Sequence, residues 1–191
     1  MKSKILIWTC RYRDNLDALS FIDKLKVPDN KKVVWIISYN NPHPPQEIVT
    51  INTEKFSVSY SKGWENIISG LNLAREFALL NGYDYMFTME DDVIVPEDAI
   101  IRLLSWKKDI VCSAYKLKNS KYSPGLFKGL IKVNFVTFGC TLISRKVLEK
   151  VEFKVINKNG KIGDMAFSED ARRAGFELYA DTDLICPHIG T

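Results

Sequence analysis

YDYMFTMEDDVIVP, residues 83–96, is a hydrophobic stretch interrupted by three consecutive acids, Glu90, Asp91 and Asp92. The apolar residues before the acids predict a buried strand, which places the three carboxylates at its carboxyl end. Like charges crowded at such a place repel one another, and a bound cation removes the repulsion. A solvated turn is the plainer explanation for a run of acids, but the apolar residues on both sides disfavour it. Carboxylate oxygens suit Mg²⁺ or Mn²⁺, so the segment indicates a metal-assisted reaction on a phosphorylated substrate.

The composition favours a single globular domain with its own core. The 191 residues are 46% hydrophobic and 26% charged. The formal net charge is only +4 and the basic residues are scattered, a pattern that does not favour a nucleic-acid partner. The four cysteines lack the paired spacing of a zinc site and indicate reduced thiols. No apolar run is long enough for a signal-peptide core or a transmembrane segment. We therefore expect a cytoplasmic protein, in the host cytoplasm if a virus encodes it.

Strand and helix patterns alternate along the first half of the chain. Strands are predicted at 4–9, 33–38, 56–60 and 83–89, and helices at 15–25 and from Trp64 to Asn81-Gly82. The second half is predicted to hold a helix opened by Pro96, strands at 109–115, 131–138 and 177–180, a short helix from Ser144 and a helix over 165–174. This order is typical of a doubly wound, mostly parallel sheet with helices on its faces. In such sheets ligands bind beyond the carboxyl ends of the strands.

Residues 85–96 resemble the DxD segment of GT-A glycosyltransferases, several of which carry it as Glu-Asp-Asp. The resemblance implies an α/β, Rossmann-like GT-A domain over residues 1–191, with a nucleotide-binding half to about residue 95 and an acceptor half after it. It also implies a divalent cation that bridges the two phosphates of a nucleotide-sugar and is bound directly by Asp92. Glu90 and Asp91 would support the cation or contact the ribose and the sugar. A gapless match to the Asp-x-Asp-Asp form of family 2 enzymes instead puts Met89 at the first acid, which leaves the division of roles open.

Residues 163–190 are similar to the closing segment of family 2 enzymes, in which an acid opens a short helix, a glycine ends it, and a histidine comes last. The resemblance makes His188 a ligand of the metal or of the diphosphate. It offers two acids as the general base: Asp164 keeps the family spacing to Gly175 and to His188, whereas Asp170, the runner-up, lies too late in the helix. Asp164 is also expected to cap this helix while facing the cleft. Read without the resemblance, these residues are a plain helix cap and a surface histidine.

Residues near the ends of the early strands are candidates for binding the donor. The resemblance implies nucleotide or donor-sugar contacts at Thr9, Arg11, Ser38, Tyr39, Asn40, Gly63 and Gly139. Arg11 can pair with a diphosphate, Tyr39 offers a face for stacking, and Asn40 offers both a donor and an acceptor to a base edge. Gly139 lies in a turn that the resemblance puts beneath the donor sugar, where glycine allows close approach of the backbone to a ligand.

The function that these features favour together is a metal-dependent glycosyltransferase. It would move a sugar from a UDP- or GDP-linked donor to a hydroxyl of a glycan, lipid or protein. Asp164 would take the hydroxyl proton during attack on the anomeric carbon, and the stereochemistry at that carbon would invert. Two alternatives stay open. One is a metal-dependent nucleotidyltransferase, although the glycine- and lysine-rich loop typical of that class does not follow the first strand. The other is a noncatalytic carbohydrate-binding or assembly protein that keeps the fold.

Overall fold

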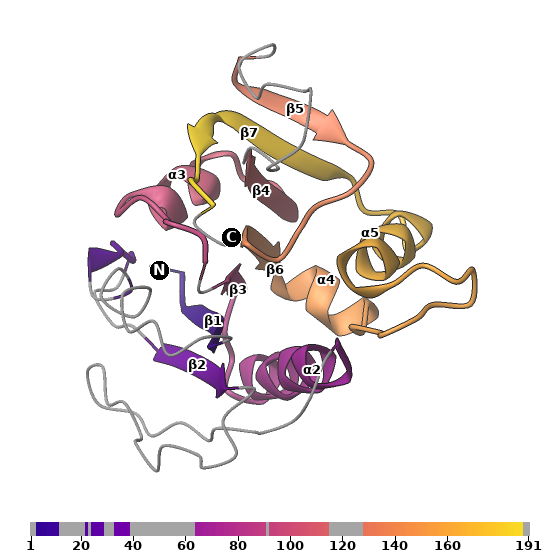
Figure 1. The fold of residues 1–191 in the computed structure, drawn as a ribbon. Helices are drawn as coiled ribbons and strands as arrows, with labels where there is room; N and C mark the ends of the chain where they lie inside the picture. The colour runs from indigo at the N-terminus through magenta and orange to yellow at the C-terminus, as the bar shows by residue number, and fades with distance from the viewer. Residues whose placement is uncertain are drawn as a thin grey trace.

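The computed structural model describes residues 3–11, 22, 24–28, 33–38, 64–90, 92–114 and 128–188 (Figure 1). The strands are β1 (Ile5–Arg11), β2 (Val33–Ser38), β3 (Tyr85–Met89), β4 (Ile110–Ala114), β5 (Leu130–Val133), β6 (Cys140–Ser144) and β7 (Leu178–Ile185). The helices with assigned bounds are α2 (Trp64–Leu80), α3 (Ala99–Ser105), α4 (Arg145–Lys150) and α5 (Gly163–Arg173).

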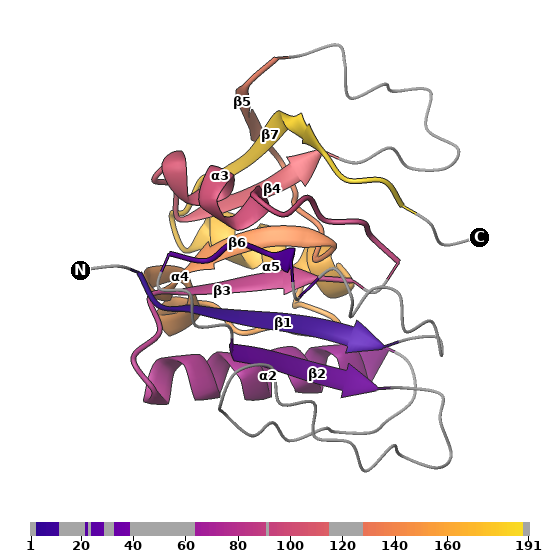
Figure 2. The same ribbon diagram turned by 90° about the vertical axis from the view of Figure 1, so that its left-hand side faces the viewer.

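The strands form a seven-stranded sheet in the order β2-β1-β3-β6-β4-β7-β5. Strand β1 is parallel to β2 and to β3, and β4 is parallel to β7. Strand β6 runs antiparallel between β3 and β4, and β5 runs antiparallel at the edge beside β7. Most strands therefore point the same way, as the sequence predicts. Figure 2 shows the arrowheads of β1 and β2 at one edge of the sheet, the edge toward which the C-terminal segment also runs.

Helices cover both faces of the sheet. Helices α2, α4 and α5 lie on one face and α3 lies on the other (Figure 1). The apolar stripe predicted for α2 is buried at Ile68, Leu71, Ala74 and Ala78, because residues three and four apart lie on the same side of a helix. Gly82 follows in a left-handed conformation with φ of 69°, which glycine adopts without strain. It ends the helix where the sequence predicts.

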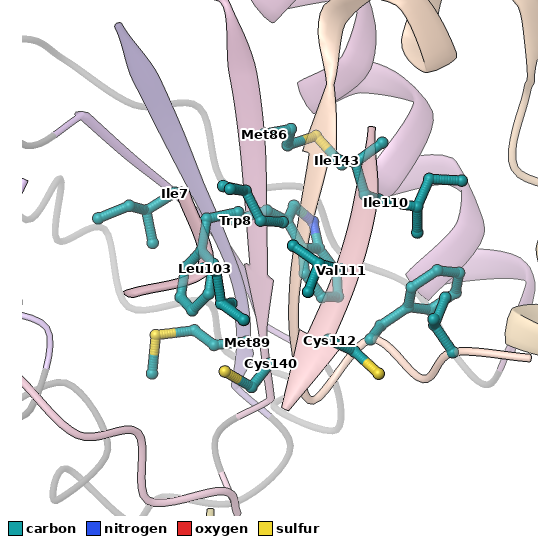
Figure 3. Packing of buried hydrophobic residues seen from close by; sticks show 14 of the residues in the cluster. Ile7, Trp8, Met86, Met89, Leu103, Ile110, Val111, Cys112, Cys140 and Ile143 are labelled. Carbon is teal, nitrogen blue, oxygen red and sulfur yellow. The ribbon is translucent and has the colours of Figure 1, made fainter. Parts of the chain in front are cut away.

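The core lies along the middle strands. Figure 3 shows buried side chains of the middle strands, among them Trp8, Met86 and Ile143 of β1, β3 and β6, together with Val111 of β4 and Leu103 of α3. Each of these side chains is fully buried, and burial of one large apolar side chain contributes about 1.5–3 kcal/mol to stability. The central position of β3 matters for function, because the acids follow directly after its last buried residue.

Three element boundaries differ most from the prediction. The helix expected to open at Pro96 begins at Ala99, after a turn in which the Ala99 N–H donates to the Pro96 carbonyl oxygen at 3.0 Å. The strand expected over 131–138 ends at Val133, because the chain leaves the sheet and the Val136 N–H donates to Ser168 Oγ at 3.0 Å. The strand expected at 177–180 extends to Ile185.

The predicted strand at 56–60 and most of the predicted helix at 15–25 lie outside the described residues. Ile22 and Leu25, two of the residues predicted to face the core from that helix, are described and are buried. No helix among the described residues has both the length and the apolar character needed to cross a bilayer.

Candidate active site

Two of the three acids, Glu90 and Asp92, follow the carboxyl end of β3 within the sheet. Met89, the last residue of β3, stands opposite Thr9 of β1 and Cys140 of β6. All three residues are buried. The chain then leaves the sheet at Glu90, whose N–H donates to the carbonyl oxygen of Gly139 at 3.4 Å. The prediction that a buried strand ends directly before Glu90 is therefore confirmed.

Asp92 and His188 meet at this edge although they are far apart in the sequence. Val93 and His188 form an isolated antiparallel bridge, and the Ile94 N–H donates to the Pro187 carbonyl oxygen at 2.8 Å. These backbone contacts bring His188 Nε2 within 3.3 Å of Asp92 Oδ2. The structure thus brings together two of the residues predicted to bind a metal.

The Asp92–His188 pair is accessible to an ion. The two side chains are 36% and 29% exposed, respectively. A carboxylate oxygen beside an imidazole nitrogen suits Mn²⁺ better than Mg²⁺, which prefers oxygen ligands throughout. Within the described ranges, no three His, Cys, Asp or Glu side chains form a group that could hold a metal, and Asp91 lies outside those ranges. The residues present therefore fit a divalent cation as part of a ligand set, with Glu90 close by in the chain.

Asp164 lies in the first turn of α5 and is partly buried. The prediction that it caps this helix is wrong: the N-cap residue is Ile162, and Gly163 already belongs to the helix. The Asp164 carboxylate instead accepts a hydrogen bond from the Met165 N–H at 2.8 Å. Burial raises the pKa of Asp164, and hydrogen bonds from the backbone offset only part of that effect. A raised pKa makes this carboxylate a better proton acceptor than an ordinary aspartate.

Helix α5 is fixed against the segment that leads to the acid edge. Ser168 lies one turn after Asp164 on the same helix face, and its Oγ accepts from the Val136 N–H and donates to the Val136 carbonyl oxygen. Phe167 stacks on Phe153 and meets the edge of Phe138, with ring centroids 4.9 and 5.6 Å apart. Residues 136–139 therefore link the helix face that carries Asp164 to the site of Glu90. No sequence pattern points to Ser168, because a serine inside a helix is usually solvated.

Asp170 has a different environment from Asp164. Its carboxylate lies 2.9 Å from Lys154 Nζ and accepts from Asn157 Nδ2 at 3.3 Å. The neighbouring Glu169 accepts from Asn157 and from Asn159, and these hydrogen bonds lower the pKa of Glu169. Both acids thus hold the loop that precedes α5. This structural function favours Asp164 over Asp170 as the base.

The residues predicted to bind the nucleotide are only partly described. Arg11 and Ser38 are register partners at the ends of β1 and β2, which supports their predicted proximity at this edge. The Thr9 side chain is buried, and its hydroxyl lies 3.5 Å from the Cys10 carbonyl oxygen, so it presents little surface to a ligand. The other predicted contacts, Tyr39, Asn40, Gly63 and Asp91, lie outside the described residues.

Gly139 is buried beside the acid edge. It is absent from the positive-φ glycines of the described chain, so its backbone conformation alone does not require glycine. The contact of its carbonyl oxygen with the Glu90 N–H is what ties this turn to the acids.

An ion pair that no sequence pattern predicts, between the buried Asp181 and the partly exposed Arg102, fixes β7, the strand that leads to His188. The Asp181 side chain is fully buried and accepts two hydrogen bonds from Arg102 of α3, at 2.6 and 2.9 Å, and one from Trp106 Nε1 at 2.8 Å. Burial alone would raise the pKa of Asp181, but the hydrogen bonds from Arg102 and Trp106 outweigh it and lower the pKa. The sequence feature that could have indicated this pair is Arg102, which lies within the otherwise apolar segment IIRLL.

We expect Asp181→Asn to lower the free energy of unfolding by about 2 kcal/mol at neutral pH, because the guanidinium of Arg102 loses its charged partner. Since the pKa of Asp181 is depressed in the folded protein, its contribution is present above about pH 4 and is lost as the pH falls through the folded-state pKa. Urea denaturation at neutral and at acidic pH measures both effects. Asp183→Asn is the control, because Asp183 is half exposed and 3.8 Å from Arg102. Equal losses in the two variants would contradict the assignment.

Comparisons with known proteins bear on the fold. No family model matches the chain, and no curated protein sequence matches it. Among solved structures, A197 from STIV has a TM-score of 0.62 at 19% sequence identity, over 98% of this chain and 86% of that one. TarS 1–349 from S. aureus has a TM-score of 0.62 at 14% identity, and its complex with UDP-GlcNAc has 0.64 at 11% identity.

These likenesses confirm the predicted fold class, a GT-A-type α/β domain with a mostly parallel sheet flanked by helices. The matches to TarS cover 98% of this chain but only 58% and 56% of the TarS chains. This chain therefore corresponds to about half of TarS 1–349. At such low identity the likeness concerns the fold alone.

Proposed function

We propose that this protein transfers a sugar from a nucleotide-sugar to a hydroxyl acceptor and that it uses a divalent cation. The observation that carries the proposal is the convergence of Asp92 and His188, 3.3 Å apart, at the carboxyl edge of a GT-A-type sheet. Ligands of such sheets bind at this edge. The two residues were predicted as metal ligands from separate parts of the sequence.

A UDP-linked donor is the first choice, with a GDP-linked donor as the alternative. A neighbour of the same fold, TarS 1–349, was crystallised in complex with UDP-GlcNAc. Arg11 and Ser38 end adjacent parallel strands, where a nucleotide can contact both strand ends. Tyr39 and Asn40 follow Ser38 directly in the sequence and would contact the base.

Asp92, His188 and Glu90 would hold Mn²⁺ or Mg²⁺. When bound, the ion would neutralise the negative charge that develops on the departing diphosphate. Asp91 would support the ion or contact the ribose and sugar. The DxD assignment, with Asp92 as the direct ligand, is part of this proposal.

Asp164 would act as the general base. The acceptor oxygen forms a bond to the anomeric carbon while the bond from that carbon to the diphosphate oxygen breaks. The diphosphate leaves with the electron pair, and the acceptor proton passes to the Asp164 carboxylate. Attack opposite the leaving group inverts the anomeric configuration. The acceptor would be a hydroxyl of a glycan, lipid or protein, and the reaction would take place in the cytoplasm, that of the host if the gene is viral.

Calorimetry with UDP-GlcNAc tests the donor and the cation together. We expect the protein to bind UDP-GlcNAc at least about tenfold more tightly with Mn²⁺ than with EDTA, because the ion offsets the diphosphate charge. GDP-mannose tests the alternative donor, in which the nucleotide carries guanine. Lack of metal-dependent binding to either nucleotide-sugar would overturn the proposal.

A further inference from the structure

We propose that a cavity at the amino-terminal edge of the sheet binds a phosphate-bearing ligand. The cavity has a volume of about 750 Å³ and is lined by the residues around the starts of β1, β3 and β4 and by the end of β6. This edge is opposite the one that carries the acids, as the direction of β1 and β2 in Figure 2 makes clear. Cavities that bind small molecules commonly have volumes of about 300–1,000 Å³.

The charge of the lining is strongly positive. Five cationic side chains surround the cavity, whereas only two carboxylates, those of Asp84 and Asp109, do so. The cationic residues are Lys4, Lys107, Lys108, Arg145 and Lys146. Two of them already have partners, since Arg145 pairs with Glu149 at 2.8 Å and Lys4 Nζ donates to the Asn81 carbonyl oxygen at 3.0 Å. This excess stands out in a chain whose formal net charge is only +4. A concave surface of one charge sign raises the local concentration of ligands of the opposite sign.

The two carboxylates are occupied by structural contacts. Asp84 Oδ2 accepts from the Lys4 N–H at 2.8 Å and so ties the start of β1 to the turn before β3. Asp109 Oδ1 accepts from Ser144 Oγ at 2.8 Å, which ties the start of β4 to the end of β6. Both acids thus hold the walls of the cavity together. Neither hydrogen bond involves a lysine ammonium group.

Three lysines retain ammonium groups that can serve a ligand. Lys146 Nζ is 3.9 Å from Asp109, and the Lys146 side chain is 78% exposed. Lys108 Nζ lies 4.3 Å from the centre of the Tyr179 ring, an interaction that leaves the ammonium group able to donate hydrogen bonds. No hydrogen bond or ion pair joins the Lys107 side chain to the rest of the described chain. Ammonium groups bind phosphates as point charges.

The backbone of Lys107 gives a second, independent indication. With φ of 52°, Lys107 is the one residue other than glycine in the left-handed region among those described. It directly follows Trp106, the C-cap of α3, and glycine is the usual residue at this position because it has no Cβ. A cationic side chain near a helix C-terminus is favourable. A lysine at the C-cap, one residue before Lys107, would provide that charge without a left-handed backbone. Strained residues of this kind cluster at functional sites.

The proposed site is independent of the donor site. It lies at the opposite sheet edge and recognises phosphate through lysines, so it needs no divalent cation. The shared chemistry is a phosphate group, which could belong to a soluble phosphorylated compound or to a phospholipid headgroup. Two probes distinguish these sources: inorganic pyrophosphate in solution, and vesicles of phosphatidylglycerol compared with vesicles of phosphatidylcholine.

The experiment measures binding of each probe to the full chain in EDTA, which removes any cation-dependent binding at the acid edge. The test variant carries Lys107→Glu, Lys108→Glu and Lys146→Glu. The control carries Lys128→Glu, Lys158→Glu and Lys161→Glu, the same charge change at exposed lysines outside the cavity. We expect the test variant to bind at least about tenfold more weakly and the control to stay within about threefold of the parent.

Each outcome decides the proposal. Pyrophosphate binding that the test variant loses indicates a soluble ligand, and binding only to phosphatidylglycerol vesicles indicates a lipid headgroup. No binding of either probe, or equal losses in test and control variants, overturns the proposal. Lys107→Gly adds a second readout: relief of the left-handed backbone raises Tm by about 2 °C, while binding weakens. A raised Tm with unchanged binding removes Lys107 from the site.

Discussion

Asp164→Asn is expected to lower the rate of sugar transfer by about a thousandfold while binding of UDP-GlcNAc stays within about threefold. The amide keeps the size of the side chain and can still accept from the Met165 N–H, but it cannot take a proton from the acceptor hydroxyl. The loss therefore appears in turnover and not in donor affinity. Release of UDP from UDP-GlcNAc, measured with Mn²⁺ and a panel of hydroxyl acceptors, gives the rate.

Asp170→Asn is the matched control, since both acids belong to α5. This change weakens the contacts of Asp170 with Lys154 and Asn157, so we expect a lower Tm with a rate within a few-fold of the parent. An inactive Asp170→Asn variant beside an active Asp164→Asn variant would reverse the assignment. A protein that binds the donor but shows no turnover in the parent would point to the noncatalytic alternative.

The pH dependence of transfer gives a further check on Asp164. A general base must be deprotonated, so the rate rises as the pH passes through its pKa and then levels off. An ordinary aspartate has a pKa of about 4. Because burial raises the pKa of Asp164, the rise in rate should lie at a higher pH than that. The same rise should be missing from the residual rate of Asp164→Asn. A rise centred at the ordinary aspartate pKa would mean that the carboxylate is more solvated during the reaction than in the structure.

The sequence predicts the sheet well where local patterns decide the structure. The runs that form β1, β2 and β3 are short and strongly apolar, and α2 has a regular buried stripe that ends at a glycine. Such patterns depend on neighbours in the chain and can be read one segment at a time. The order of the strands cannot be read that way. Insertion of β6 antiparallel between β3 and β4 depends on tertiary pairing.

Prediction of the site from the sequence is limited for the same reason, because the positions of its side chains depend on tertiary contacts. Asp92 and His188 were predicted individually, but their 3.3 Å separation depends on the bridge between Val93 and the C-terminal segment. The error at Asp164 is local: an aspartate near a helix start suggested a cap, whereas α5 begins one residue before it with Gly163. Helix boundaries often shift by one or two residues. The Arg102–Asp181 pair was missed because its members come from elements that meet only in the folded chain.

Asp92→Asn is expected to weaken Mn²⁺-dependent binding of UDP-GlcNAc by at least about a hundredfold. Loss of residues that merely support a metal ligand costs about 10–100-fold, and loss of a charged ligand should cost more. Without metal, the Tm should stay within about 2 °C of the parent, because the pair with His188 is partly exposed and such pairs contribute little. Calorimetry with and without Mn²⁺, together with thermal unfolding in EDTA, separates lost binding from lost folding.

The control for this change is Asp98→Asn, which removes the same charge from an exposed acid a few residues later. The Asp98 side chain makes no capping hydrogen bond to α3, so its replacement should leave Mn²⁺-dependent binding unchanged.

His188→Gln then shows whether Asp92 and His188 act on one ion. If both bind it, the losses from Asp92→Asn and His188→Gln are not additive in the double variant. Additive losses would show that the two residues act independently, and an Asp92→Asn variant that keeps its response to Mn²⁺ would show that the convergence of these side chains serves the fold alone.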